Sequence, residues 1–239
     1  SAITNYYAGG YTTGFYISTN GGLNWSGTDN IKKTSGATIT TIGDPCLVIN
    51  RNNYYVLNYI APSPTSGYDL KIGASYSTNN GTHWSPTVYI PGVDTADKPV
   101  SAVDNIISSP YSGRIYTAYD GLYNFGEETK GIFFSYSSDN GMSWDSSRRI
   151  TNVDANFKYR LIGDIAVGTF GEVFILWHSK RSYMGLAKST NGGVNWLFNS
   201  DTAIVTDKAK VTQSYEDVYL QSVPAMDIDV SNGPGSNWI

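Results

Sequence analysis

The chain has 239 residues, of which 40% are hydrophobic and only 15% are charged, and its formal net charge is −4. Because its lysines and arginines are scattered, it offers no basic face, and we predict that nucleic acid is not a partner. No apolar run approaches the roughly 18 residues of a membrane-spanning helix, so we predict no membrane span. Nineteen tyrosines, many glycines and no sustained helical periodicity predict an all-β protein.

The first predicted elements are a strand at about 12–17 and, directly after it, an octamer Ser-Thr-Asn-Gly-Gly-Leu-Asn-Trp at 18–25. The octamer recurs three times with one skeleton: a Ser, an Asn or Asp two residues later, a Gly two after that and a Trp three further on. The residues of this skeleton are Ser18, Asn20, Gly22, Trp25, Ser77, Asn79, Gly81, Trp84, Ser137, Asp139, Gly141, Trp144, Ser189, Asn191, Gly193 and Trp196. The copies begin 59, 60 and 52 residues apart, a period that fits one four-stranded blade of a β-propeller enlarged by loops.

Each octamer has the composition of a tight turn. Asn-Gly and similar pairs accept the positive φ of hairpin turns, and Ser, Asn and Asp side chains hydrogen-bond nearby backbone amides. The Trp stands where the next strand begins, so its ring can pack over the turn and bury a large apolar area. We therefore interpret the octamers as structural turns.

Short apolar segments open the units between the octamers. They begin near 44, 97, 163 and 224, and the first three are followed by a turn and a second apolar or aromatic run. We predict second strands at 54–59, 114–119 and 173–177, third strands at 71–76, 131–136 and 183–188, and a fourth strand at 88–90. The first segment of the last unit, 224–230, is also predicted to be a strand.

These elements predict a single β-propeller region over 1–239 built from four-stranded antiparallel blades. Complete blades are expected at about 44–93, 97–153 and 164–205, with partial blades at 1–43 and about 211–239. We expect an incomplete part of a propeller with six or more blades. The alternative is a closed four-bladed propeller, in which the first strand near the C-terminus and the strands near the N-terminus share one blade.

The octamer resembles the Asp-box, or BNR repeat, of the sialidase superfamily. In that family the box links the third and fourth strands of a blade on the outside of the propeller, which implies a structural role here. Only Asp139 keeps the acidic residue, and Asn replaces it in the other three boxes. The resemblance also implies an arginine triad and an Arg-Ile-Pro motif on the first strand of the first blade, and that motif is missing from this chain.

Four residues are candidates for ligand binding. Arg160 precedes a predicted first strand and could hold an anionic group, or form an ordinary ion pair. Tyr123, Glu127 and Glu128 lie in a long loop between a second and a third strand, a combination suited to sugar stacking and hydroxyl recognition. An ordinary solvated loop would have the same composition. No residue is assigned a catalytic role.

The cysteine and histidine content indicates neither a disulfide nor a metal site. The single Cys46 lies in an apolar segment and cannot form an internal disulfide, which fits an exported bacterial protein. Two isolated histidines without matching ligand spacing predict no zinc site, and no cofactor is expected.

Three functions fit this sequence. The first is a secreted or cell-surface recognition module that binds an extracellular glycan or another surface protein. The second is a glycoside hydrolase of the exo-sialidase type, with catalytic residues partly outside this chain. The third is a structural component of a surface assembly, since propellers carry many unrelated functions.

Overall fold

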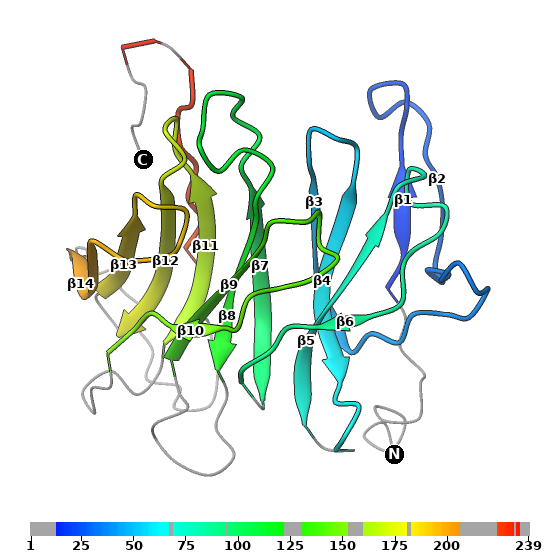
Figure 1. Ribbon diagram of the computed structural model, residues 1–239, viewed down its shortest axis with the longest axis horizontal. Coiled ribbons are helices and arrows are strands. Elements are labelled where there is room, and N and C mark those ends of the chain that lie inside the picture. The colour runs from blue at the N-terminus through cyan, green and yellow to red at the C-terminus, as the bar shows by residue number, and fades with distance from the viewer. Residues whose placement is uncertain are drawn as a thin grey trace, which may run out of the picture.

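The protein is described by a computed structural model, which covers 13–66, 69–93, 95–121, 131–152, 160–180, 183–205, 224–231 and 233–234. Fourteen strands and no helix are assigned in these residues, so the all-β prediction is confirmed (Figure 1). The strands are β1 Phe15–Ile17, β2 Ser26–Thr28, β3 Gly43–Ile49, β4 Tyr55–Pro62, β5 Leu70–Ser77, β6 Val88–Tyr89, β7 Ala96–Val103, β8 Ile115–Gly121, β9 Gly131–Ser137, β10 Arg148–Arg149, β11 Leu161–Val167, β12 Val173–Lys180, β13 Tyr183–Ser189 and β14 Phe198–Val205. Within the described ranges, no helix is long and apolar enough to cross a membrane.

The strands form three four-stranded sheets and one two-stranded sheet. In chain order the sheets contain β1 and β2, then β3 to β6, then β7 to β10, then β11 to β14, and every neighbouring pair is antiparallel. Each sheet is a meander in which consecutive strands pair, as in a propeller blade. The predicted second and third strands are confirmed, because β4, β8 and β12 occupy the second place and β5, β9 and β13 the third.

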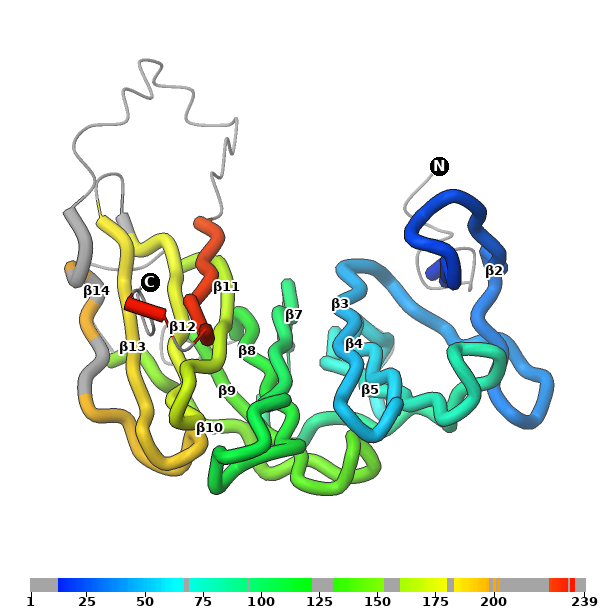
Figure 2. Tube along the Cα trace, turned by 90° about the horizontal axis from the view of Figure 1, so that it is seen from above, coloured from blue at the N-terminus to red at the C-terminus, as the bar shows by residue number. Residues whose placement is uncertain are grey.

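The sheets stand side by side along an open arc (Figure 2). The first strands β3, β7 and β11 lie on the inner side of the arc, and the later strands of each sheet lie further out. The pair β1–β2 and the segment 224–231 lie at opposite ends of the arc rather than in one shared blade. The alternative of a closed four-bladed ring is therefore wrong for the described residues, and the fold is a partial propeller.

The hydrophobic core is divided among the junctions between neighbouring sheets. Phe15 of β1 packs with Trp84 and Tyr59 of the next sheet. A second cluster joins β3–β6 to β7–β10, and a third joins β7–β10 to β11–β14 around Phe134 and Trp177. Since each sheet buries its two faces against different neighbours, a blade in this protein depends on the blade before and the blade after it.

The predicted strand at 224–230 is not assigned as a strand. A strand needs a partner in a ladder, and no described residue pairs with this segment. Its contacts nevertheless match those of the first strands. Met226 N donates to Asp164 Oδ2 of β11 at 2.9 Å. At the end of the segment, Ser231 N donates to Asp229 Oδ1 at 2.8 Å. The same kind of turn follows β7, where Ile106 N donates to Asp104 Oδ1.

Candidate functional site

The strand register defines two edges of the arc. Ala96 at the start of β7 pairs with Gly121 at the end of β8, and Gly121 pairs with Gly131 at the start of β9. The box that follows β9 therefore lies at the opposite end of the sheet. We call the edge with the starts of β3, β7 and β11 the mouth edge, and the edge with the octamers the box edge.

The octamers use their polar side chains inside the turn. In the third box, Ser137 Oγ donates to Asp139 Oδ1 and accepts from Gly141 N, both at 2.8 Å, and Asp139 Oδ1 accepts from Ser143 N at 2.9 Å. The same three bonds recur in the other boxes, with an Asn side chain in place of the Asp. Each box joins the strand before it to the next strand of the same sheet, and these polar side chains are used in hydrogen bonds within the turn.

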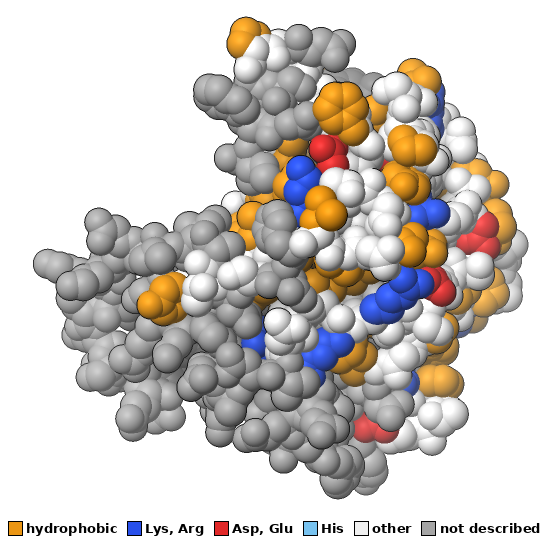
Figure 3. Space-filling model, turned by 60° about the vertical axis from the view of Figure 1, so that its left-hand side comes forward, with side chains coloured by type: hydrophobic (Ala, Val, Ile, Leu, Met, Phe, Trp, Pro, Cys, Tyr) orange, Lys and Arg blue, Asp and Glu red, His pale blue; other side chains and the backbone are white. Residues whose placement is uncertain are grey.

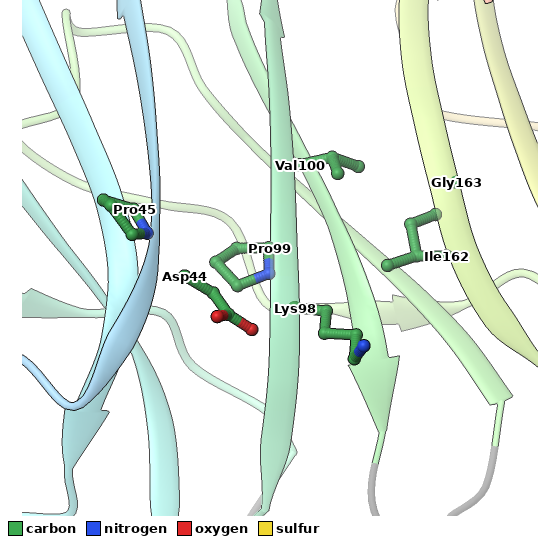
Figure 4. A pocket seen from close by; sticks show the side chains of 7 residues that line it. All are labelled: Asp44, Pro45, Lys98, Pro99, Val100, Ile162 and Gly163. Carbon is green, nitrogen blue, oxygen red and sulfur yellow. The ribbon is translucent and has the colours of Figure 1, made fainter. Parts of the chain in front are cut away.

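A cavity of about 170 Å³ lies at the mouth edge, where the three first strands converge (Figure 4). Its walls are Asp44, Pro45, Lys98, Pro99, Val100, Ile162 and Gly163. Figure 4 shows the Asp44 side chain between β3 and β7, and the Lys98 side chain on the other side of β7, toward Ile162. Asp44 and Lys98 both have positive φ, 49° and 51°, where the register of their strands shifts. These bulges place one acidic and one basic side chain at the cavity.

Two further aspartates lie beside the cavity at the same edge. Asp97 precedes Lys98 in β7, and Asp120 is near the end of β8, directly opposite Asp97. Burial raises the pKa of Asp97, and the neighbouring charge of Asp44 raises it further. Burial raises the pKa of Asp120 to about 8, although Ile162 N donates to its Oδ1 at 2.7 Å. Asp120 is therefore largely protonated at neutral pH, and it joins β8 to the next blade.

Cys46 lies in β3 and Ser101 lies in β7, the neighbouring first strand. Ser101 N donates to Cys46 Sγ at 3.1 Å across the junction between β3 and β7. Burial raises the pKa of the Cys46 thiol. The neutral thiol thus serves as a hydrogen-bond acceptor between two blades, and its raised pKa opposes the thiolate that a nucleophile would need.

The predicted ligand-binding residues are only partly placed. Tyr123, Glu127 and Glu128 lie outside the described residues. Arg160 is half-buried and directly precedes β11, but it is not among the residues that line the cavity. Other arginines make contacts elsewhere: Arg114 stacks between Tyr111 and Tyr136 and donates to Gly192 O, and Arg148 pairs with Asp145 at 2.6 Å.

Sequence reasoning missed the cavity residues Asp44 and Lys98. The available signal was a charged residue immediately before a Pro at the start of two first strands, Asp44-Pro45 and Lys98-Pro99. No local sequence signal indicated that Asp120 is buried, because its burial depends on contact with the neighbouring blade in the folded protein. In the described part of the chain, no group of three or more His, Cys, Asp or Glu side chains is arranged to hold a metal ion.

Solved structures similar to this fold include sialidases and trans-sialidases. A Hadza microbial sialidase is 19% identical with a TM-score of 0.52, and the match covers 65% of this chain and 37% of that one. The leech intramolecular trans-sialidase is 11% identical with a TM-score of 0.54, covering 79% and 46%. The intramolecular trans-sialidase from Ruminococcus gnavus is 11% identical with a TM-score of 0.55, covering 81% and 64%. At these identities the likeness shows the fold alone, and the chain spans less than two thirds of each of these proteins.

Comparison with curated proteins by sequence gives no match. The family model of the BNR repeat-like domain matches residues 9–219, which is most of the chain and includes all four boxes. The chain therefore belongs to the BNR repeat-like domain family.

Proposed function

We propose that this protein is an extracellular recognition module that binds a neutral, hydroxyl-rich glycan at the mouth edge of its propeller. The observation that carries the proposal is the cavity between β3, β7 and β11, which gathers Asp44 and Lys98 at the edge opposite the structural boxes. A carboxylate and an ammonium group together can accept from and donate to sugar hydroxyls. The cavity is smaller than the roughly 300–1,000 Å³ of typical ligand pockets, so it suits a terminal sugar ring rather than a long oligosaccharide.

The charge at the mouth edge supports a neutral ligand over sialic acid. Asp44 lines the cavity and Asp97 lies beside it, against Lys98 in the wall, whereas the protonated Asp120 adds no charge. An anionic sugar would meet a carboxylate there, and no arginine is among the residues of the wall. On the coloured part of the face that Figure 3 shows, lysine and arginine side chains lie in separate places rather than in one patch.

Glycoside hydrolysis is the second candidate, and Asp120 is the observation that favours it. Glycosidases commonly use a carboxylic acid with a raised pKa together with a carboxylate, and Asp120 and Asp97 lie on paired strands at the mouth. Asp120 is only 4% exposed, and its Oδ1 already accepts the amide of Ile162. These contacts favour a structural use of the acid, so recognition without turnover is the first proposal.

The test compares a neutral and a sialylated sugar on the same protein. Lactose and 3′-sialyllactose would be titrated into the chain by NMR, for the wild type and for Asp44→Ala, Lys98→Ala and the control Asp145→Asn near the box edge. We expect the neutral sugar to bind more tightly, and the two mouth variants to lose this binding while the control keeps it. Preference for the sialylated sugar, or binding that is insensitive to both mouth variants, would overturn the proposal. Release of free galactose or sialic acid would favour the hydrolase.

A further inference from the structure

A group of polar side chains lies among the apolar residues of the junction between the sheets β3–β6 and β7–β10. Asn58 of β4 and Thr117 of β8 are both 0% exposed. They meet Ser101 of β7, whose Oγ lies 3.2 Å from Asn58 Oδ1 and 3.3 Å from Thr117 Oγ1. Ser101 N donates to Cys46 Sγ of β3 at 3.1 Å. We call Cys46, Asn58, Ser101 and Thr117 the polar layer.

The polar layer lies directly beside the wall of the mouth cavity. Cys46 follows the wall residue Pro45 in β3, and Ser101 follows the wall residue Val100 in β7. Thr117 Oγ1 donates to the backbone O of Val100 at 3.2 Å. The layer therefore ties β3 to β7 next to the two bulges that bring one acid and one base to the cavity.

Stability alone does not explain the polar layer. The side-chain Nδ2 of Asn58 donates to no described residue, although the side chain is fully buried. A buried donor without a partner destabilises a fold, and an apolar side chain of the same shape would avoid that loss. Buried polar groups can instead select one arrangement of packed elements over others of similar stability. In this junction, that arrangement is the spacing and register of β3 against β7.

The polar layer uses a thiol where other junctions use a carboxylate. Asp120 Oδ1 accepts from Ile162 N at 2.7 Å, and Asp164 Oδ2 accepts from Met226 N at 2.9 Å. Each of these bonds, like that of Cys46, joins a side chain of one blade to the backbone of the next first strand or segment. A carboxylate in place of the thiol would repel the two aspartates of β3 and β7 at the mouth. The neutral thiol makes the bond without that charge.

We propose that the polar layer positions the mouth: it holds β3 against β7 so that Asp44 and Lys98 face the cavity at the spacing that a sugar requires. Cys46, Asn58 and Ser101 are then positioning residues, which act on the site without touching the ligand. The link to sugar binding rests on the function proposed above, whereas the spacing of the two strands can be measured without any ligand.

The titration of Asp97 reports that spacing. Burial raises the pKa of Asp97, and the charge of Asp44, on the other strand, raises it further. Lys98 and Asp120 also act on Asp97, but both belong to its own sheet. If β3 moves away from β7, the pKa of Asp97 should fall toward its ordinary value, because both the burial and the charge of Asp44 then act less. An NMR titration of this carboxyl group measures the change.

The main variant is Asn58→Leu, which replaces the buried amide with an apolar side chain of similar shape. We expect urea unfolding to show a fold at least as stable as the wild type, while the pKa of Asp97 falls. Lactose binding, measured by NMR, should weaken by roughly 2- to 30-fold, as for residues that act on a site through their neighbours. Ser75→Ala is the matched control, because Ser75 is a buried polar residue of the same sheet that bonds to Tyr59 in the other junction. It should change neither the titration nor the affinity.

A second pair of variants tests the bond across the junction. Cys46→Ser keeps an acceptor for Ser101 N, whereas Cys46→Val has nearly the same size and no acceptor. We expect Cys46→Ser to titrate and bind as the wild type does, and Cys46→Val to shift the pKa of Asp97 in the same direction as Asn58→Leu. Circular dichroism of each variant checks that the fold is retained.

Three results would overturn the positioning role. The first is an Asp97 titration that is the same in the wild type, Asn58→Leu and Cys46→Val, even if the wild type binds lactose. The second is a shifted titration with unchanged affinity, and the third is a large loss of stability in Asn58→Leu, which would make the layer part of the fold only. A wild type that binds no lactose, with Asp97 shifted in both variants, would contradict the proposed function and still support the control of strand spacing by the polar layer.

Discussion

The first box and the other three boxes have the same turn in different surroundings. All four make the same hydrogen bonds between Ser, Asn or Asp, and the backbone. Among the described residues, only the later three are packed against a preceding sheet, and the exposure of the box Trp follows that difference, from 63% at Trp25 to 1% at Trp84. The octamer therefore encodes the turn by itself, whereas the burial of its Trp comes from the neighbouring blade.

The largest effect is expected when the box Trp is removed from a closed junction. Trp84→Ala should lower the free energy of unfolding by about 3–5 kcal/mol, because the ring is fully buried against Phe15. Trp25→Ala should cost less than about 1 kcal/mol, since most of the ring is already in water. Urea unfolding of both variants measures the contrast. Equal losses would mean that the octamer, not the junction, determines the contribution of the Trp.

A closed junction also contains a buried carboxyl group whose effect depends on pH. Burial raises the pKa of Asp120 to about 8, whereas an unfolded Asp titrates near 4. Between these values the folded state holds a proton that the unfolded state has lost, so stability falls as pH rises from about 4 to about 8. Asp120→Asn should remove this decline and keep the acceptor for Ile162 N. The gain at pH 9 should reach a few kcal/mol, since each unit of pKa shift corresponds to about 1.4 kcal/mol.

The measurement is the free energy of unfolding of wild type and Asp120→Asn at pH 5 and pH 9. Asp97→Asn provides a graded comparison, because burial also raises the pKa of Asp97 but Asp97 is less enclosed. Asp97→Asn should also reduce the loss of stability between pH 5 and pH 9, but by less than Asp120→Asn does. A wild type whose stability does not fall between these pH values would show that Asp120 is ionised in the fold.

The box glycines separate backbone strain from packing. Gly193 and Gly22 have almost the same φ, 84° and 89°, so replacement by Ala costs each variant about 1–2 kcal/mol of backbone strain. Only Gly193→Ala also places a methyl group against Phe134, which should add about 1–3 kcal/mol. The difference in thermal or urea unfolding between the two variants therefore reports the junction contact alone. Similar losses would indicate that Phe134 moves aside.

The repeat made most of the fold predictable from the sequence. The octamers marked the link between third and fourth strands, and period-two aromatic runs marked second strands such as β4 and β8, because both signals are local. The arrangement of the two ends of the arc depends on contacts between distant residues, which no local sequence signal reports. The segment 224–230 has the apolar pattern of a strand, but assignment as a strand requires a partner that the pattern cannot supply.

The candidate site was less predictable, for a physical reason. Asp44 and Lys98 reach the cavity through bulges in β3 and β7, and a bulge changes side-chain direction without a clear sequence signal. Asp120 looks like an ordinary acid at a strand end, and only the neighbouring blade buries it. Arg160 directly precedes β11, but its place in the sequence could not decide whether its side chain reaches the cavity.

The smallest predicted effect concerns the only box with an acid. Asp139 accepts from both Ser143 N, at 2.9 Å, and Ser143 Oγ, at 2.5 Å, whereas the seventh box residue is Asn24, His83 or Asn195 in the other copies. Burial alone would raise the pKa of Asp139, but the hydrogen bonds from Ser143 and Ser137 lower it overall. Its contribution to stability is therefore present above the ordinary pKa and lost as pH falls through the lowered one.

Asp139→Asn should cost about 0.5–1 kcal/mol at pH 7, because a charged acceptor is replaced by a neutral one, and should cost nothing in strong acid. In a Ser143→Ala background the same substitution should have a smaller effect, since the hydroxyl donor is then missing, and a double-mutant cycle in urea measures the coupling. A cost at pH 7 that is unchanged by Ser143→Ala would contradict this explanation. For comparison, Asn79→Asp in the second box should increase the free energy of unfolding only slightly, because His83 donates to that side chain only through its backbone N–H. The acid of this box is then explained by the hydroxyl four residues later, which the boxes with Asn lack.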